Sequence, residues 1–181
     1  FELAEYESVE THLRELASAR VLIDSQKTSV FFARILKDGD NKLIKAPNPS
    51  TLLKIHKSRK ELRHFKNAMI ADGIALCEFF AWFEKAMKQG AKLSELDIDT
   101  QISAFRAKHP LYICNSFATI AGFNANSALP HYQATAQEHA QISGNGLLLI
   151  DSGAQYQNGT TDITRVVPVG KVFKTQQRDY T

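Results

Sequence analysis

A run of apolar residues in the middle of the chain constrains the fold more than any other feature of the sequence. Its members, at alternating three- and four-residue steps, are Leu62, Phe65, Met69, Gly73, Leu76, Phe80, Phe83 and Met87. This is the spacing of one face of an α-helix. Ser58 and Glu61 form a capping-box pattern before the run, and Gly90 follows its last turn. The run therefore predicts a helix of about 30 residues with one strongly apolar face.

The elements after this helix indicate the fold class. A second helix is predicted over 94–108, ended by His109 and Pro110. The sequence then changes to strand-like segments at 111–113, 118–120, 146–150 and 160–169, with turn signals at 144–146 and 158–159. Helices followed by a meander of strands favour an α+β fold over a wound parallel sheet.

The first part of the chain is predicted to contain one helix and two short strands. An amphipathic helix is predicted over 5–19, and short strands over 20–24 and 43–44 with a turn at 38–41 between them. Pro47 and Pro49 then predict an extended connector, which is the best candidate for a domain boundary. We therefore divide the chain into domains at 1–49 and 50–181. Because the sequence starts at Phe1 without a methionine and ends at Thr181, we expect it to be part of a longer protein.

Composition excludes several classes of protein. Of the 181 residues, 44% are hydrophobic and 23% charged, which is typical of a globular domain and not of a disordered chain. The net charge of +3 is too small to indicate a nucleic-acid or membrane partner, and no apolar stretch approaches the ~20 residues that cross a bilayer. Cys77 and Cys114 lack metal-site spacing and favour a reducing compartment. The basic residues of 54–66 are interpreted as a solvated helix face.

The segment DSGAQYQNGTTDITR, residues 151–165, is the strongest candidate for chemistry. Asp151 ends an apolar run, where a buried carboxylate is costly unless a cation meets it, and Asp162 lies among residues that favour a strand. In a hairpin whose paired residue numbers add to an odd value, both carboxylates project from one sheet face. A two-residue turn at Asn158 and Gly159 would leave them about 13 Å apart, so a shared metal site would need a wider loop or a bulge. Alternatively, Asp151 is a turn residue and Asp162 a solvent-facing one.

His131 is the second candidate, because it follows Pro130 in a loop-like segment that leads into a short extended stretch. Taken alone, a histidine in such a place is more often a structural or surface residue.

At these residues the sequence resembles the aminopeptidase P/creatinase group of metallopeptidases, which have the pita-bread fold. The resemblance covers roughly residues 50–171 and rests on three segments: the long helix, ALPHY at 128–132, and D-x-G-x-x-Y…G-x-x-D-x-T-R from residue 151. It implies that residues 50–181 are the N-terminal half of a pita-bread domain, and that residues 1–49 end a preceding α/β non-catalytic domain.

The resemblance also implies roles for the candidate residues. Asp151 resembles the aspartate that chelates one metal of a dinuclear site, Asp162 the aspartate that bridges both metals, and His131 the histidine that binds substrate. It implies two divalent ions, Mn²⁺ most often, which agrees with an oxygen-rich donor set. The family's remaining ligands, one histidine and two glutamates, come later in the chain than Thr181. We therefore expect this 181-residue piece to be inactive by itself.

Two interpretations stay open. In the first, the chain belongs to a cytoplasmic, homodimeric Xaa-Pro aminopeptidase, which hydrolyses the bond between an N-terminal residue and a following proline and has no nucleic-acid or membrane partner. In the second, it belongs to a non-enzymatic pita-bread module that binds peptides, histones or RNA. The presence of Asp151, Asp162 and His131 favours the enzyme.

Overall fold

The computed structural model describes residues 3–179, which form two compact units divided between Ser58 and Arg59. The sequence placed the boundary nine residues earlier, and the predicted limits of the domains stay a prediction. Pro49 does not continue an extended connector as predicted. It opens a short helix, because Asn48 caps the helix by accepting from the Ser50 amide and proline is favoured in the first turn.

The first unit is a small α/β arrangement. Its elements are η1 (Tyr6–Ser8), α1 (Val9–Glu15), β1 (Arg20–Ile23), α2 (Val30–Asp38), β2 (Lys42–Lys45) and α3 (Pro49–Ile55). The strands β1 and β2 are parallel, so the chain between them must cross over, and α2 makes that crossing. Both strands were predicted, whereas α2 was missed and the first helix is shorter than predicted.

The second unit contains the predicted long helix, α4, which spans the 30 residues Arg59–Lys88. The other elements are β3 (Leu93–Ser94), α5 (Glu95–Ala107), β4 (Tyr112–Asn115), β5 (Ile120–Phe123), η2 (Asn124–Ala128), β6 (Gln141–Ile142), β7 (Gly146–Ser152), β8 (Ala154–Tyr156), β9 (Gly159–Thr160), β10 (Ile163–Val169) and α6 (Lys174–Asp179). All pairings between strands of this unit are antiparallel. The α+β class predicted from the sequence is confirmed.

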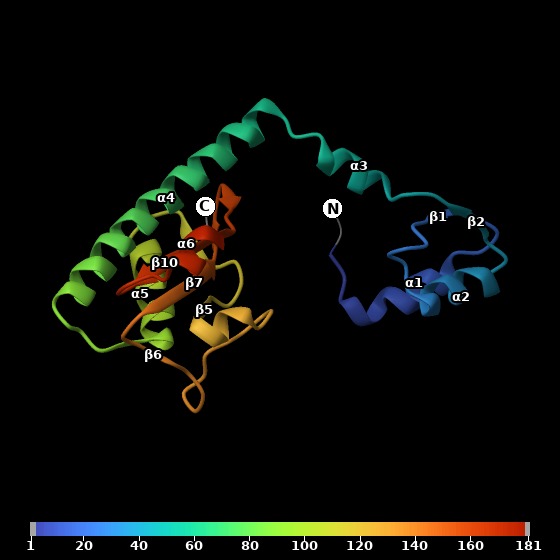
Figure 1. Ribbon diagram of the computed structural model, residues 1–181. Coiled ribbons are helices and arrows are strands. Elements are labelled where there is room, and N and C mark those ends of the chain that lie inside the picture. The colour runs from blue at the N-terminus through green and yellow to red at the C-terminus, as the bar shows by residue number, and fades with distance from the viewer. Residues whose placement is uncertain (1–2, 180–181) are drawn as a thin grey trace. The chain divides into compact units, whose positions relative to one another are not determined.

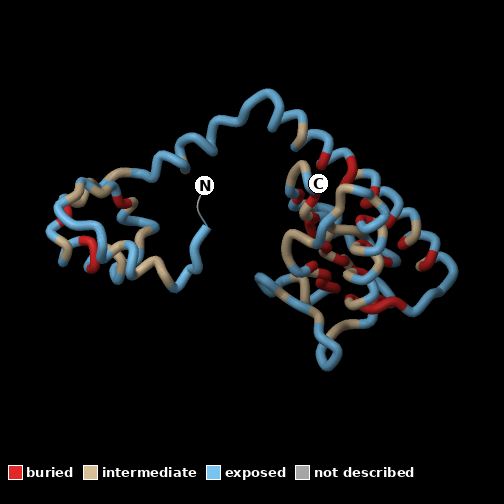
Figure 2. Tube along the Cα trace, turned by 180° about the vertical axis from the view of Figure 1, so that it is seen from behind, coloured by how far each residue is buried: buried red, intermediate tan, exposed pale blue. Residues whose placement is uncertain are grey.

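The core of the second unit lies between its two long helices and one face of the sheet β10-β7-β5 (Figures 1 and 2). Burial alternates along β7, so Leu148 and Ile150 face the core while their neighbours do not. They join Phe79 of α4 and Ile98 and Ile102 of α5 in one cluster. The opposite face of the sheet, called here the open face, carries Ile120, Gly122, Leu147, Leu149, Asp151, Thr164, Val166 and Pro168.

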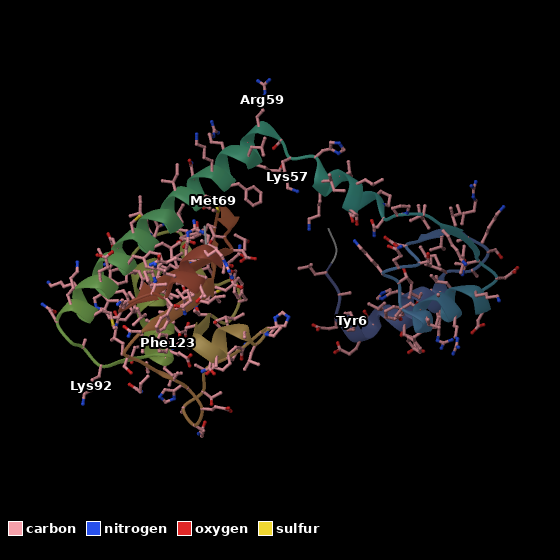
Figure 3. All side chains as sticks on the ribbon, viewed as in Figure 1. Tyr6, Lys57, Arg59, Met69, Lys92 and Phe123 are labelled. Atoms are coloured by element: carbon pink, nitrogen blue, oxygen red, sulfur yellow. The ribbon has the colours of Figure 1, made fainter. Side chains whose placement is uncertain are left out.

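The buried side of α4 differs from the predicted one. In the first half of the helix, Phe65 and Met69 are 40% and 44% exposed, while Ala68 is buried. The reason is the close approach of the hairpin β8–β9, where a Cβ added to Gly159 would lie 3.0 Å from the Ala68 Cβ. Only a small side chain fits between the two backbones at this point. Arg59 and Lys57 are exposed, as expected for a solvated basic stretch (Figure 3).

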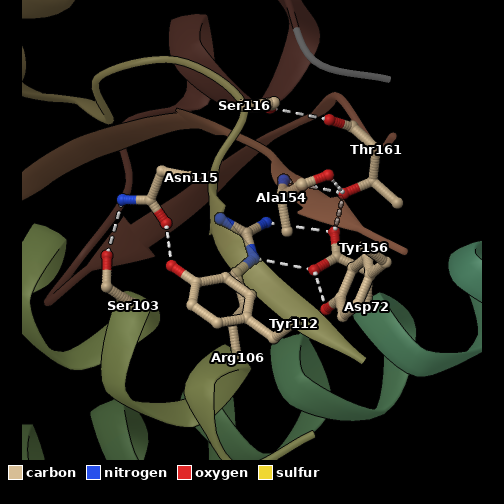
Figure 4. A network of polar contacts seen from close by, with 9 residues as sticks. All are labelled: Asp72, Ser103, Arg106, Tyr112, Asn115, Ser116, Ala154, Tyr156 and Thr161. Carbon is tan, nitrogen blue, oxygen red and sulfur yellow. Dashed lines mark hydrogen bonds and ion pairs between the residues drawn. The ribbon is translucent and has the colours of Figure 1, made fainter. Parts of the chain in front are cut away.

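A buried ion pair ties these elements together (Figure 4). Arg106 of α5 and Asp72 of α4 have no exposed side-chain surface, and they are joined by bonds of 2.7 Å and 3.0 Å from Nε and Nη2 of the arginine. Two hydroxyls from the hairpin also donate to the Asp72 carboxylate, Tyr156 at 3.0 Å and Thr161 at 2.8 Å. We call these four residues the Asp72 network. Burial, followed by the nearby Asp72 charge, raises the pKa of Tyr156 and keeps it a donor.

The Asp72 network predicts a large stability difference between two ion pairs that join the same two helices. Asp72→Ala leaves the Arg106 charge buried and uncompensated, and should lower the free energy of unfolding by about 3–5 kcal/mol. Glu78→Ala removes the partner of Lys108 in an exposed pair and should cost less than about 1 kcal/mol. Urea denaturation of the two variants measures both values. Equal losses would contradict this account of the network.

Candidate functional site

The two candidate aspartates lie on one β-hairpin whose turn is Gln157–Asn158. Tyr156 pairs with Gly159, and Ser152 pairs with Ile163. The residue numbers of both pairs have the same sum, so the register is the same at both ends of the hairpin. That register places Asp162 opposite Gly153, two residues from Asp151. For regular strands such diagonal neighbours are about 7–8 Å apart. The turn is one residue earlier than the sequence indicated, so the four-residue offset that a turn at Asn158 and Gly159 would give does not occur.

Asp151 lies on the open face, and the odd sum of the paired residue numbers assigns Asp162, which lies in the break between β9 and β10, to the same side of the hairpin. Asp151 pairs with Thr164 across the strands, and the Thr164 hydroxyl donates to Asp151 Oδ1 at 2.8 Å. Asp151 is half-buried and Asp162 is exposed. Asp151 is therefore less buried than its place after an apolar run suggested, and its role as a metal ligand stays a prediction. What these residues offer is two accessible carboxylates side by side on one sheet face.

A break in the hairpin precedes Asp162 and is held in place from the core. The Thr161 hydroxyl accepts from the Ala154 amide at 2.9 Å while it donates to Asp72, and the Thr161 carbonyl accepts from the Ser116 hydroxyl. A Cβ at Gly153 would overlap that carbonyl, so only glycine permits this approach. The Asp72 network therefore sets the position of the backbone that carries Asp162.

His131 lies in the loop that follows η2. The helix η2 packs on the open face. Gly122 projects to that face, and a Cβ there would come within 2.8 Å of the Ser127 Cα in η2. His131 is exposed and has a φ of 57°, an uncommon value for a residue other than glycine. Within residues 3–179 no hydrogen bond joins its imidazole to either aspartate. The structure thus brings the two aspartates together and places His131 on a separate loop.

A second buried carboxylate, that of Glu95, was missed by the sequence analysis. Glu95 has no exposed surface and begins α5. It accepts from the Phe123 and Ala140 amides, each at 2.7 Å, from the Tyr132 hydroxyl at 2.8 Å, and from the Asn126 side-chain amide at 3.1 Å and 3.2 Å. We call this set the Glu95 cluster. It joins both ends of the loop that contains His131.

The sequence carried a signal for the burial of Asp72 and Arg106, but none for that of Glu95. Asp72 and Arg106 each lie on the apolar stripe of a helix, where a charge of one sign requires a charge of the other. Glu95 follows Ser94, whose hydroxyl and amide form a capping box with Asp97. The helix start was predicted, but no pattern marks a side chain at its first position as buried.

The chemical type of the ligands, two carboxylates, suits a hard divalent cation. Carboxylate oxygens are the ligands that Mg²⁺, Ca²⁺ and Mn²⁺ prefer. Asp151 and Asp162 supply two such groups from one face, with Thr164 orienting one of them. In the described part of the chain no group of three or more His, Cys, Asp or Glu side chains could hold a metal ion. The two aspartates therefore provide part of a coordination sphere.

The Glu95 cluster predicts a pH effect. Burial and the hydrogen bond to Glu95 raise the pKa of Tyr132 from 10.0 to about 12. Because the folded protein favours the neutral phenol, this contribution to stability is present below pH 10 and is lost as the pH rises to about 12. The difference in phenolate absorbance between wild type and Tyr132→Phe should titrate near pH 12. A midpoint near 10 would contradict this environment.

None of the helices within residues 3–179 is both long and apolar enough to cross a membrane.

Comparison with known proteins assigns the family. The profile described as "Metallopeptidase family M24" matches residues 63–181. "Probable Xaa-Pro aminopeptidase P" of Arthroderma benhamiae is 38% identical over 143 residues, which are 78% of this chain and 20% of that protein. This chain therefore spans about a fifth of that relative's length.

Solved structures agree on the fold. X-prolyl aminopeptidase from Caenorhabditis elegans, described as a cytosolic enzyme with a di-nuclear active site, matches 94% of this chain and 29% of its own with a TM-score of 0.80 and 26% identity. The N-terminal domain of FACT complex subunit SPT16 from chickpea matches 96% of this chain and 44% of its own with a TM-score of 0.70, but at 16% identity it shows the fold alone. The predicted pita-bread architecture is confirmed. From the profile match and this fold, the chain belongs to metallopeptidase family M24.

Proposed function

We propose that the complete protein is a metal-dependent aminopeptidase that hydrolyses the bond between an N-terminal residue and a following proline. The observation that carries this proposal is the pair Asp151 and Asp162, which are accessible and offset by two residues on one face of a hairpin. Membership of family M24 and the similarity to proteins named Xaa-Pro aminopeptidase support the same reaction.

In this proposal the two aspartates hold two divalent cations, with further ligands from outside residues 1–181. When bound, such ions polarise a scissile carbonyl and lower the pKa of a bound water. Asp151 and Asp162 contribute oxygens, and the Thr164 hydroxyl donates a hydrogen bond to Asp151 Oδ1. The Thr161 hydroxyl donates to Asp72 and so fixes the backbone next to Asp162. His131 binds the substrate from its loop.

Finer features of the proposal come from the family resemblance and the donor chemistry. Mn²⁺ is the proposed metal, because carboxylates favour hard divalent ions. The partner is a peptide with proline at its second position, and the complete protein is proposed to be a cytoplasmic homodimer. The nematode enzyme of similar fold is described as cytosolic, and free, exposed Cys77 and Cys114 agree with a reducing compartment.

The second candidate function is a module that binds peptides, histones or RNA without catalysis. The SPT16 domains have the same fold, and their likeness to this chain concerns the fold alone. Because fold does not decide function, the residues of the site must distinguish the peptidase from the binding module. A binding module has no need for a metal at Asp151 and Asp162, whereas the peptidase requires one.

Activity of the complete protein tests the proposal. The longest uninterrupted reading frame that contains this chain should release the first residue of an Xaa-Pro-Xaa peptide in a Mn²⁺-dependent manner, with little release from Xaa-Ala-Xaa. Asp162→Asn should lower kcat by at least about 10²-fold, since even residues that only orient metal ligands contribute 10–100-fold. The exposed Asp38→Asn, in the first unit, serves as the matched control. Absence of activity with every divalent metal would refute the peptidase and favour the binding module.

The 181-residue chain alone should give no measurable turnover, because two aspartates leave most of the coordination sphere to water. Isothermal titration with Mn²⁺ should detect only weak binding, lost in Asp162→Asn. Full activity in this piece would contradict the requirement for ligands from outside it.

A further inference from the structure

The loop that carries His131 is anchored mainly through one buried carboxylate. Both Glu95 oxygens are used: Oε1 accepts from the Phe123 amide, and Oε2 from the Ala140 amide and the Tyr132 hydroxyl. Phe123 ends β5 and Ala140 precedes β6, so these bonds hold the two ends of the loop (Figure 1). Tyr132, bonded in its middle, directly follows His131.

The Glu95 cluster requires, at position 95, a side chain that accepts hydrogen bonds and donates none. All the groups that point at Glu95 are N–H or O–H donors, and an ionised carboxylate has lone pairs for all of them. An amide in its place would turn an NH₂ group toward at least one of these donors. The donors are neutral, and within residues 3–179 no cation pairs with Glu95. Its position at the start of α5 supplies the favourable end of a helix dipole instead.

The conformation of His131 also requires an anchor. Its positive φ persists only where the surrounding structure determines it. Pro130 restricts the chain on one side, and on the other the Tyr132 hydroxyl donates to Glu95 and accepts from Asn126. We propose that Glu95 is a positioning residue for His131, acting through Tyr132 to hold the imidazole where the substrate binds. The inference rests on the proposed function, in which His131 contacts the substrate.

Kinetics of the complete, Mn²⁺-loaded protein test this role. Glu95→Gln keeps the size of the side chain and should lower kcat roughly 10²-fold, the loss expected from a displacement of about 1 Å. Tyr132→Phe removes a single hydroxyl and should lower kcat in the same direction by less. Bound metal should stay unchanged in both variants. Glu138→Gln changes an exposed carboxylate of the same loop and should leave kcat unchanged.

A double-mutant cycle separates positioning from general stability. If Glu95 acts through His131, then Glu95→Gln added to His131→Ala should change kcat by less than about twofold, because the group it positions is already absent. A merely structural role would lower kcat by the same factor in both backgrounds. That additive result would overturn the inference.

Hydrogen exchange separates this inference from the proposed function. If the wild-type protein hydrolyses no Xaa-Pro peptide, the proposed function has failed. Hydrogen exchange of the metal-free protein then still tests whether Glu95 holds the loop in place. The Phe123 and Ala140 amides bond directly to Glu95, so in Glu95→Gln both should exchange at least tenfold faster, while amides of β7 keep their protection. The nuclear magnetic resonance signals of the His131 imidazole should shift with them. Unchanged exchange and unchanged imidazole signals would overturn the inference.

Discussion

The bidentate pair between Asp72 and Arg106 is the interaction on which the second unit depends. It lies without exposed surface between α4 and α5, which come before the hairpin in the chain. Additional hydrogen bonds offset part of the cost of burying such a pair. The hairpin supplies two, from the Tyr156 and Thr161 hydroxyls to the Asp72 carboxylate, whereas Arg106 Nη1 has no hydrogen-bond partner among the described residues (Figure 4). The contacts that dock the hairpin on the two helices therefore also hold the backbone that leads to Asp162.

The two buried carboxylates, Asp72 and Glu95, each hold a segment that carries a candidate site residue. Asp72 has a cationic partner and holds the strand segment that leads to Asp162. Glu95 has neutral donors and holds the loop of His131. Both are buried, whereas Asp151 lies on the open face and Asp162 is exposed. The rigid polar contacts are thus buried, and the carboxylates left for chemistry stay accessible.

The prediction from sequence succeeded where the signal is local. The limits of α4 and the start of α5 agree with their caps and breakers. The prediction failed where packing decides. The buried side of α4 runs through Ala68 because a hairpin backbone passes close by, which the apolar repeat of Phe65 and Met69 could not indicate. The helix α2 was also missed, although Ser29 caps its first turn and Gly39 follows its last residue.

The candidate site divides in the same way. Three segments, among them residues 151–165, indicated the family. The alternation of side chains along a strand predicted that both aspartates share one face of the hairpin. The turn position, and with it the two-residue offset of Asp151 and Asp162, came only from the structure. So did Glu95, Asp72 and Arg106, whose partners lie 28 to 89 residues away along the chain. Sequence by itself determined the local periodicities, the caps and the family motif. Tertiary structure alone decided which buried charges meet, because a hydrogen bond depends on distance in space, which a sequence position does not encode.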